Sequence, residues 1–400
     1  MKRQFNIINV GAGVTGLTLA ARLTLGPHAD ALNVTVVVGA PRPFFSPADQ
    51  LALRVSAIAA GTVVLLDSLG AWGYVNASRA CPYESMRVWD EDDDADGAAT
   101  LTFDAAEFGV AQLGYIVENV LLQHALLQRL DDTAAQLCFK RVLRSLGQDG
   151  RVYRLVVDDE QEMTADLVVG ADGVRSFVRS AVGIETRRWP YDQTAFVTHL
   201  TPEIEHRNTA RQRFLRDGPL GMLPLADGRV SVVWSTTPAV ARHASEADDE
   251  ELGRMLSEAS DYVLGELIVD GPRGTFPLAA QHARQYVMPG VALIGDAAHA
   301  IHPLAGQGAN LGLQDAAELA NVVEQALEAG LNPGDQPALR RYERARKGAN
   351  ATMLHLMTGL NRLFATDSRL VGELRSAGMR LFNRTGPIRE RAVKVALGVR

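Results

Sequence analysis

The sequence predicts an α/β protein in which a Rossmann-like, nucleotide-binding domain carries an inserted, mostly antiparallel β-sheet domain and C-terminal helices. Two short apolar runs, 5–10 and 34–38, predict the first domain, because such runs are typical of strands buried on both faces. Four apolar residues between the runs share one helical stripe, namely Val14, Leu17, Ala21 and Leu25. Gly26-Pro27 ends that helix, and the β-α-β order begins a parallel sheet.

Later segments complete this architecture. Strand-like runs at 165–172 and 291–296 end in Gly-x-Asp or Gly-Asp, and helical spacing follows from about 308 to 330. The stretch 186–285 differs, because β-rich runs succeed one another between turn signals, which predicts the antiparallel insert. From about Pro337 the pattern is helical again.

The composition excludes several classes of protein. The 400 residues are 47% hydrophobic with a net charge of −7, which is ordinary for a soluble protein and does not favour nucleic-acid binding. Cys81 and Cys138 make no disulfide framework, which fits a reducing compartment. No apolar run reaches the roughly 18 residues of a spanning helix. Because the chain enters a strand almost at once, we expect no cleavable leader and a cytoplasmic protein.

Charge is distributed unevenly along the chain. From Arg340 to the C-terminus, 14 Lys or Arg face 4 Asp or Glu, a net charge of +10, so the other 339 residues carry −17. Such a tail either meets a membrane surface or partner, or packs against the acidic body. The acidic run at 90–96 is interpreted as a solvated loop, because like charges repel and stay hydrated.

A glycine motif, Gly11-Ala-Gly13-Val-Thr-Gly16, stands between the first strand and the first helix. In that context the first glycine permits a tight turn, the second lets backbone approach a pyrophosphate, and the third lets helix and strand pack closely. The acid that usually binds the adenosine ribose after the second strand is missing, since Gly39-Ala-Pro-Arg42 stands there.

Two further motifs accompany it, Gly-Ala-Asp172-Gly173 in the middle of the chain and Gly295-Asp296 near its end. Alone, the middle motif reads as a strand that ends in a turn. His299 and His302 are spaced like metal ligands, but no third ligand of fitting spacing stands nearby and a proline follows His302. We therefore expect no metal site.

The three motifs together resemble those of the flavin-dependent aromatic hydroxylases of the para-hydroxybenzoate hydroxylase-like superfamily. Segments 53–72, 114–126, 212–234 and 302–320 resemble the ubiquinone-biosynthesis hydroxylases within it, and the similarity extends from residue 5 to about 345. The resemblance implies FAD contacts at Gly11, Gly13, Gly16, Arg54, Asp172, Gly173, Gly295, Asp296, Pro303, Gly306, Gln307, Gly308 and Asn310. Asp296 would bind the ribityl hydroxyls, and Pro303 with 306–308 would line the isoalloxazine ring. A salt bridge is an equally open role for Arg54.

The resemblance also implies a division of the chain. The FAD-binding domain would comprise 1–80, 106–185 and 286–336, the substrate domain 81–105 and 186–285, and a helical region 337–400. Six residues of the insert are candidates for an apolar wall over the ring or for the core of the insert: Phe214, Leu220, Met222, Leu223, Leu225 and Trp234. A helix N-terminus near Gly308 would stabilise negative charge on the reduced flavin.

The implied activity is hydroxylation of a polyprenylphenol ring in ubiquinone biosynthesis. NAD(P)H would reduce FAD, O2 would add to give a flavin C4a-hydroperoxide, and that species would deliver the hydroxyl. No residue is singled out as a catalytic acid or base. Two alternatives stay open, a flavin monooxygenase of a soluble aromatic compound and a flavin-binding scaffold of a quinone-synthesis complex. The basic tail favours peripheral contact with the inner membrane or with such a complex, and the charge pattern permits a homo-oligomer.

Overall fold

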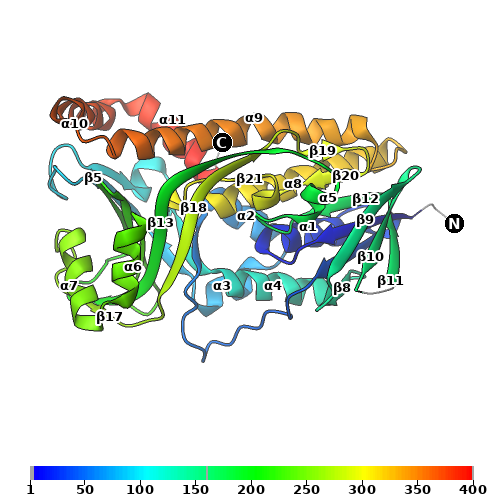
Figure 1. The fold of residues 1–400 in the computed structure, drawn as a ribbon, viewed down its shortest axis with the longest axis horizontal. Helices are drawn as coiled ribbons and strands as arrows, with labels where there is room; N and C mark the ends of the chain where they lie inside the picture. Colours follow the sequence, from blue (N-terminus) through cyan, green and yellow to red (C-terminus); the bar gives the residue numbers. More distant parts are fainter. Residues whose placement is uncertain (1–3, 159–160, 399–400) are drawn as a thin grey trace.

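The computed structural model describes residues 4–158 and 161–398, which form two lobes (Figure 1). One lobe is built on a six-stranded sheet in the order β19-β20-β12-β1-β2-β8, in which only β19 is antiparallel. Its strands are β1 (Phe5–Val10), β2 (Leu32–Val38), β8 (Gln136–Phe139), β12 (Leu167–Gly170), β19 (Val287–Met288) and β20 (Val291–Leu293). The predicted parallel sheet is confirmed, and its parallel strands bring their carboxyl ends to one edge.

Helices and a small sheet complete this lobe. Helix α1 (Val14–Leu25) packs against both α4 (Asn119–Asp131) and α8 (Gln307–Glu328), and all three contribute to one hydrophobic core. Helix α5 (Phe177–Ala181) follows β12, and η1 (Ala29–Ala31) precedes β2. An antiparallel sheet is formed by β9 (Leu143–Asp149), β10 (Val152–Val157) and β11 (Gln161–Ala165).

The second lobe contains a large sheet in the order β21-β18-β13-β16-β15-β14-β5-β6, with β17 paired to β13. Its strands are β5 (Ser85–Asp90), β6 (Leu101–Asp104), β13 (Thr186–Pro202), β14 (Thr209–Leu215), β15 (Gly218–Pro224), β16 (Val230–Thr236), β17 (Leu267–Val269), β18 (Gly274–Ala283) and β21 (His299–Ala300). Only the pair β14–β5 is parallel, so the expected mostly antiparallel insert is confirmed. The long strands β13 and β18 reach across to the first lobe (Figure 1).

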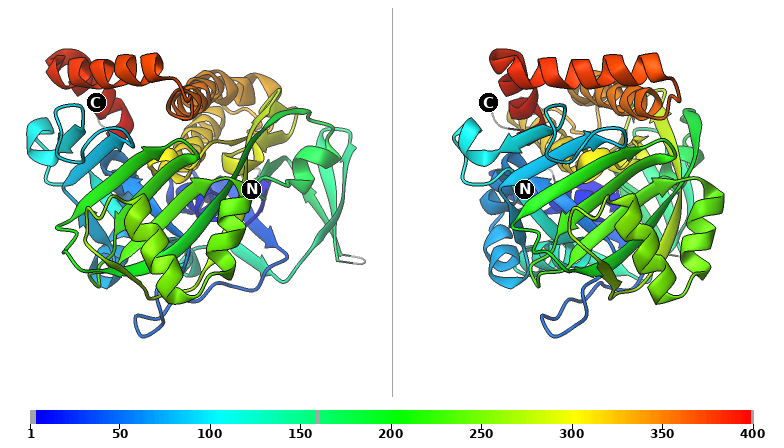
Figure 2. Two further views of the ribbon diagram at one scale, coloured as in Figure 1. Left: turned by 60° about the vertical axis from the view of Figure 1, so that its left-hand side comes forward. Right: turned by 90° about the vertical axis from the view of Figure 1, so that its left-hand side faces the viewer.

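Two helices in the insert were not predicted. Helices α6 (Pro238–Glu246) and α7 (Asp249–Ala259) lie on one face of the large sheet (Figure 2). A signal for both was present in the sequence, because Thr237 and Asp248 are N-caps whose side chains accept the amides of residues 240 and 251.

These helices decide between the two roles predicted for three residues of the insert, in favour of the insert core. Leu220, Met222 and Trp234 belong to the core beneath α6 and α7, so they face away from the first lobe. Because side chains alternate along a strand, Leu223 points to the opposite face and packs with Leu51 and Leu225.

A second three-stranded sheet packs against α8. It is formed by β3 (Val55–Ala59), β7 (Gly114–Glu118) and β4 (Cys81–Tyr83), all antiparallel. The associated helices are α2 (Ala60–Ser68), α3 (Trp72–Ser78) and η2 (Ala105–Phe108). Buried Glu118 at the end of β7 pairs with Arg79. The Glu118 carboxylate also accepts the Ala52 amide at 2.7 Å, which holds the loop after β2 in place.

The chain ends in three helices, α9 (Gln336–Phe364), α10 (Arg369–Arg384) and α11 (Gly386–Leu397), which run along one side of both lobes (Figures 1 and 2). Helix α9 begins in the first lobe, where buried Tyr342 donates a hydrogen bond to the Leu293 carbonyl. It ends against the second lobe, where the rings of Phe364 and Phe214 stack with centroids 3.8 Å apart. The helices therefore connect the two lobes.

The acidic run at 90–96 is not the solvated loop that we expected. Asp90 is buried and pairs with Arg375 of α10, and the Ser376 hydroxyl donates to Asp93 at 2.7 Å. Arg216 pairs with Glu91 at 3.0 Å. The run therefore docks the basic C-terminal region onto the second lobe, because opposite charges far apart in sequence meet there.

Within the described ranges, no helix combines the length and apolar character needed to cross a membrane.

Candidate functional site

The glycine loop between β1 and α1 is packed too tightly for larger residues. The Gly11 amide donates to the Val37 carbonyl at 2.9 Å, and the φ of Gly11 is 114°. A Cβ on Gly11 would lie 2.3 Å from the Ala171 carbonyl oxygen, and a Cβ on Gly16 would lie 2.3 Å from that of Gly11. Both glycines thus allow β1, α1 and the turn after β12 to approach one another.

Gly13 differs, because no described protein atom lies within 4 Å of a Cβ built on it. It is the N-cap of α1, where no side chain accepts the free amides and the first turn carries no acid. Gln123 of α4 steadies the loop by donating to the Ala12 carbonyl at 2.8 Å. The arrangement leaves an uncapped helix N-terminus facing open space, which suits a phosphate.

The middle motif forms a second turn at the same edge of the sheet. Asp172 caps α5, since its carboxylate accepts the Ser176 hydroxyl at 2.5 Å and the Phe177 amide at 2.7 Å. Gly173 has a φ of 81° and no described atom within 4 Å of an added Cβ. The side chain of Asp172 is therefore used within the fold, and a contact of this motif with FAD stays a prediction.

A residue that sequence reasoning missed joins this turn to the late motif. Buried Arg179 of α5 donates to the carbonyls of Val174 and Ala297, each at 2.8 Å. Burial lowers the pKa of its guanidinium, and the charge of Asp172 opposes that effect. No sequence signal distinguishes Arg179 from a surface arginine, because its partners are backbone carbonyls.

The late Gly-Asp pair lies in η3 (Gly295–Ala297), directly after β20. Gly295 has a φ of 56°, and the side chain of Asp296 is exposed. The protein around Asp296 raises the pKa of its carboxyl by desolvation, while the charges of His299 and Arg54 oppose the rise. An exposed carboxylate at this position can accept hydrogen bonds from hydroxyl groups.

Arg54 stands on the loop before β3. The described residues supply no ion pair for it, and its guanidinium lies 5.7 Å from the centre of the Phe276 ring. Its charge reaches Asp296, as the effect on that carboxyl shows. Of the two open roles, the geometry favours the one near the flavin motif.

The segment from Pro303 leads through η4 (Leu304–Gly306) into α8. Gly306 has a φ of 63°, and an added Cβ would lie 2.7 Å from that of Ala57 in β3. Gly308 has no described atom within 4 Å of an added Cβ, and the first turn of α8 carries no acid. As predicted, a helix N-terminus begins there and faces open space.

Asn310 holds this helix against β3. Its side-chain oxygen accepts the Ala59 amide at 3.0 Å, and its side-chain nitrogen donates to the Ala57 carbonyl at 2.8 Å. Since the side chain is buried and committed to these bonds, its predicted contact with FAD remains a prediction.

The two histidines near this segment have separate partners. His299 is bonded to Asp315. The Nε2 atom of His302 lies 3.1 Å from the side-chain oxygen of Gln193, and burial lowers the pKa of His302 to about 4. Neutral His302 therefore donates to Gln193 and ties the segment before Pro303 to β13. No group of three His, Cys, Asp or Glu suited to a metal ion occurs within 4–158 and 161–398.

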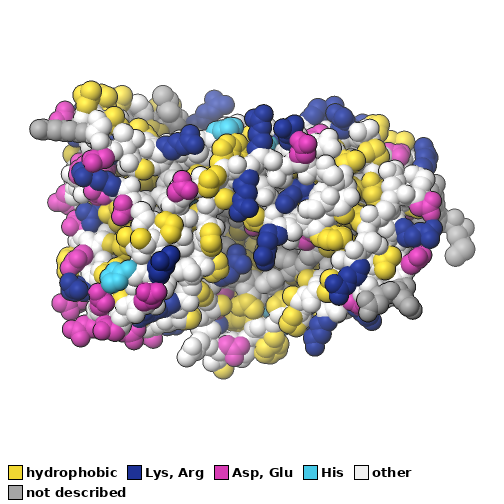
Figure 3. Space-filling view, viewed as in Figure 1, with side chains coloured by type: hydrophobic (Ala, Val, Ile, Leu, Met, Phe, Trp, Pro, Cys, Tyr) yellow, Lys and Arg dark blue, Asp and Glu magenta, His cyan; other side chains and the backbone are white. Residues whose placement is uncertain are grey.

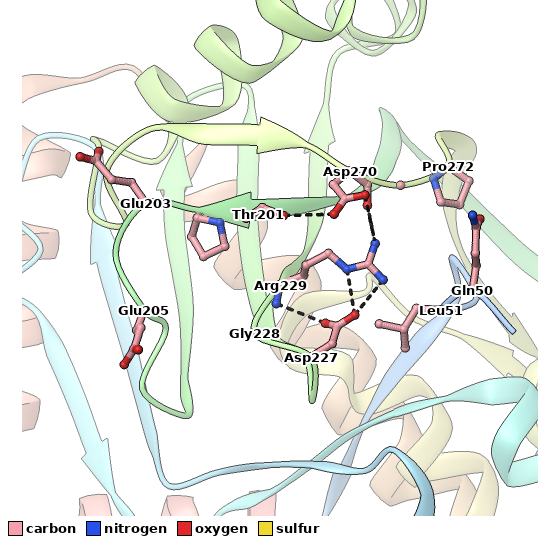
Figure 4. Close-up of a pocket in the computed structure, with 12 residues that line it drawn as sticks. Gln50, Leu51, Thr201, Glu203, Glu205, Asp227, Gly228, Arg229, Asp270 and Pro272 are labelled. Atoms are coloured by element: carbon pink, nitrogen blue, oxygen red, sulfur yellow. Dashed lines mark hydrogen bonds and ion pairs between the residues drawn. The ribbon is translucent and has the colours of Figure 1, made fainter. Parts of the chain in front are cut away.

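A pocket of about 810 Å3 lies elsewhere, at the end of the large sheet (Figure 4). Arg229 extends between Asp227 and Asp270 and pairs with Asp227 at 2.8 Å. Glu203 and Glu205 add two further carboxylates to the lining. Such an acidic pocket suits neither a dinucleotide nor an apolar ring, and none of the glycine motifs contributes to it.

Three turns and two uncapped helix N-termini thus meet at the carboxyl edge of the central sheet. Positions Gly13, Gly173 and Gly308 leave the space that a long ligand needs, and exposed Asp296 stands among them. Figure 3 shows a hollow in the middle of this face with Lys and Arg side chains around it. These features fit a dinucleotide that carries a pyrophosphate, and together with the fold they define a dinucleotide-binding protein.

Comparison with known proteins specifies the family. Residues 4–355 match the family described as FAD binding domain, and the chain belongs to it, with FAD as cofactor. It is 37% identical to 3-demethoxyubiquinol 3-hydroxylase of Escherichia coli, covering 98% of this chain and 97% of that one. It is 36% identical to ubiquinone hydroxylase UbiL of Rhodospirillum rubrum, covering 98% and 89%. The fold matches p-nitrophenol 4-monooxygenase PnpA of Pseudomonas putida with a TM-score of 0.77 at 17% identity, covering 99% and 97%.

Proposed function

We propose that this FAD-dependent monooxygenase hydroxylates the aromatic ring of a polyprenylated intermediate in ubiquinone biosynthesis, using NAD(P)H and O2. The observation that carries the proposal is the full-length similarity to two hydroxylases of ubiquinone or its precursors. The match includes both lobes, so it covers the large sheet of the second lobe as well as the motifs that we propose bind FAD.

Each motif has a role in this proposal. The N-terminus of α1 at Gly13 would hold the pyrophosphate, Asp296 would accept the ribityl hydroxyls, and the Pro303–Gly308 backbone would line the ring. Bound FAD supplies the activation of O2 for ring hydroxylation. The uncapped N-terminus of α8 would stabilise negative charge on a reduced flavin bound there.

The substrate would meet the FAD ring beneath the large sheet, on the face opposite α6 and α7. An apolar cluster there joins Leu304, next to Pro303, with Phe214, Met357 and Phe364. These side chains are buried, so the cluster would form an apolar backing behind the substrate site and help to keep water away from the reaction. Methionine in the cluster adapts its shape to an apolar chain.

The test is mass spectrometry of lipid extracts from a strain deleted for this gene. We expect loss of ubiquinone and accumulation of a polyprenylated intermediate that lacks one hydroxyl, with rescue by the wild-type gene. A variant such as Asp296→Asn separates an enzyme from a scaffold, because a scaffold would still rescue without its flavin. Unchanged ubiquinone, with no new intermediate, would contradict the proposal.

We further propose that the outer side of α10 rests on an anionic membrane surface. Three leucines on one stripe of this helix are exposed, Leu370 by 67%, Leu374 by 65% and Leu381 by 64%. Arg380 and Arg384 flank them on the same helix and are exposed. Figure 3 shows hydrophobic side chains over α10 at the upper left and basic ones along the top edge over α9. Apolar and basic groups together suit anionic lipid.

Replacing Leu370, Leu374 and Leu381 by glutamine is expected to lower binding to vesicles with anionic lipid by roughly 1,000-fold or more, since each buried leucine contributes about 1.5 kcal/mol or more. Co-sedimentation at low and high salt measures the effect. Ile268→Gln is the matched control, because Ile268 of β17 is equally exposed but lies in another part of the lobe. Equal loss with Ile268→Gln, or no vesicle binding by the wild type, would refute the proposal. Contact with partner enzymes or a second copy stays a prediction.

A further inference from the structure

A fully buried carboxylate, Asp315 of α8, lies against the Gly295-Asp296 turn. Its Oδ2 atom accepts the Gly295 amide at 3.1 Å and His299 Nε2 at 2.5 Å. Its Oδ1 atom accepts Arg346 Nε at 2.7 Å and Asn350 Nδ2 at 3.0 Å, both from α9. One side chain therefore connects the turn to two long helices.

The charges make this arrangement stiff. Burial by itself raises the pKa of Asp315, but His299 and Arg346 outweigh burial, so the pKa is lowered and the carboxylate is ionised. An ionised acceptor with four donors makes strong, short hydrogen bonds and leaves no position free. His299 is held from its other side as well, because its ring stacks with Tyr286 at 5.9 Å.

The backbone amide of Gly295 donates one of these four hydrogen bonds. The φ of Gly295, 56°, is a left-handed conformation that glycine adopts readily, and its amide has Asp315 as partner. The next residue, Asp296, carries the exposed carboxylate, and His299 contributes to the charge that Asp296 experiences. Asp315 thus acts on both residues of the motif without reaching the open space itself.

We propose that Asp315 is a positioning residue for FAD: it accepts the Gly295 amide and His299 and so holds the Gly295-Asp296 turn ready for the cofactor. The inference rests on the assignment of this turn to FAD proposed above. A preformed turn binds more tightly, because the cost of ordering it is met when the protein folds.

Asp315→Asn is the informative variant. The amide has nearly the same shape, but it offers one acceptor oxygen in place of two and removes the charge facing Arg346. We expect FAD affinity to fall about tenfold or more, as for a lost hydrogen bond to a charged group. The visible circular dichroism of residual bound flavin should also change, because the turn beside the ring is displaced.

Asp90→Asn is the matched control. Asp90 is likewise buried and paired with a buried arginine, Arg375, but it stands at the far end of the second lobe. It is expected to lower thermal stability while FAD affinity and the flavin spectrum stay unchanged. If Asp315→Asn behaves in the same way, Asp315 is merely structural and the inference is wrong.

Hydrogen exchange of the FAD-free wild type gives a test that no variant can spoil by misfolding. The amide of Gly295 is expected to be protected before FAD is added, because the Asp315 carboxylate accepts it. Rapid exchange there would overturn the inference. Asp296→Asn tests the underlying assignment separately. If Asp296→Asn and Asp315→Asn both retain full FAD affinity, the assignment of the turn to FAD fails. If Asp296→Asn loses FAD affinity and Asp315→Asn does not, only the role of Asp315 is rejected.

Discussion

Gly11→Ala is expected to abolish FAD binding and to destabilise the fold by about 3 kcal/mol or more. The added methyl group would lie 2.3 Å from a backbone oxygen of Ala171, and the φ of 114° is strained for alanine. Both the β1–α1 loop and the turn after β12 would have to move. Thermal unfolding and fluorescence titration with FAD measure the two effects.

Gly13→Ala is the control for this result. Its methyl group would meet no described protein atom within 4 Å, so the unfolding temperature of the FAD-free protein should match that of the wild type. FAD affinity should nevertheless fall by roughly 10- to 100-fold. The methyl group would keep the pyrophosphate away from the backbone amides of the loop, and hydrogen bonds to its charged oxygens would be lost. Full FAD affinity in Gly13→Ala would show that the pyrophosphate does not lie there.

Asp296→Asn is expected to weaken FAD binding while stabilising the FAD-free protein at neutral pH. The loss of a charged acceptor should lower FAD affinity by about 10- to 100-fold. The gain in stability follows from the raised pKa of Asp296, since desolvation makes its ionised form unfavourable in the fold. Differential scanning fluorimetry without FAD, and titration with FAD, separate the two effects.

The dependence on pH has a definite sign. A carboxyl with a raised folded-state pKa contributes stability below its ordinary value of 3.8 and loses that contribution as pH rises through the raised value. The stability advantage of Asp296→Asn should therefore appear at neutral pH and vanish below about pH 3.8. Wild-type FAD affinity should fall as pH drops through the raised pKa, whereas that of the variant should stay flat. An advantage that persists in acid would contradict this account.

Local sequence patterns were sufficient to predict the turns and helix starts that we propose hold FAD. The glycine motif with its flanking strand and helix predicted β1 and α1, and the late Gly-Asp motif predicted a turn before a helix that begins at Gln307. These predictions held because tight turns and helix starts depend on residues close in sequence. The caps Thr237 and Asp248 were signals of the same local kind, and attention to them would have revealed α6 and α7.

Partners of charged side chains could not be predicted in this way. Asp90 and Arg375 are 285 residues apart, and the acidic run read as solvent-exposed because its neighbours in sequence are all acids. Asp315 likewise gave no sign that it accepts the Gly295 amide, 20 residues earlier. The sequence likewise left open which face of the sheet Leu220, Met222 and Trp234 occupy, because alternation along a strand defines two faces but not which one a helix covers.

By itself the sequence determined the α/β class, the three motifs that we propose bind FAD, and the resemblance to ubiquinone-biosynthesis hydroxylases. The tertiary structure alone decided which groups hold those motifs in place, namely Arg179 between the middle and late turns and Asp315 beside the late turn. The physical reason is the range of the interactions. Backbone conformation and periodicity act over a few residues, whereas burial, hydrogen bonding and charge pairing act between residues that only the folded chain brings together.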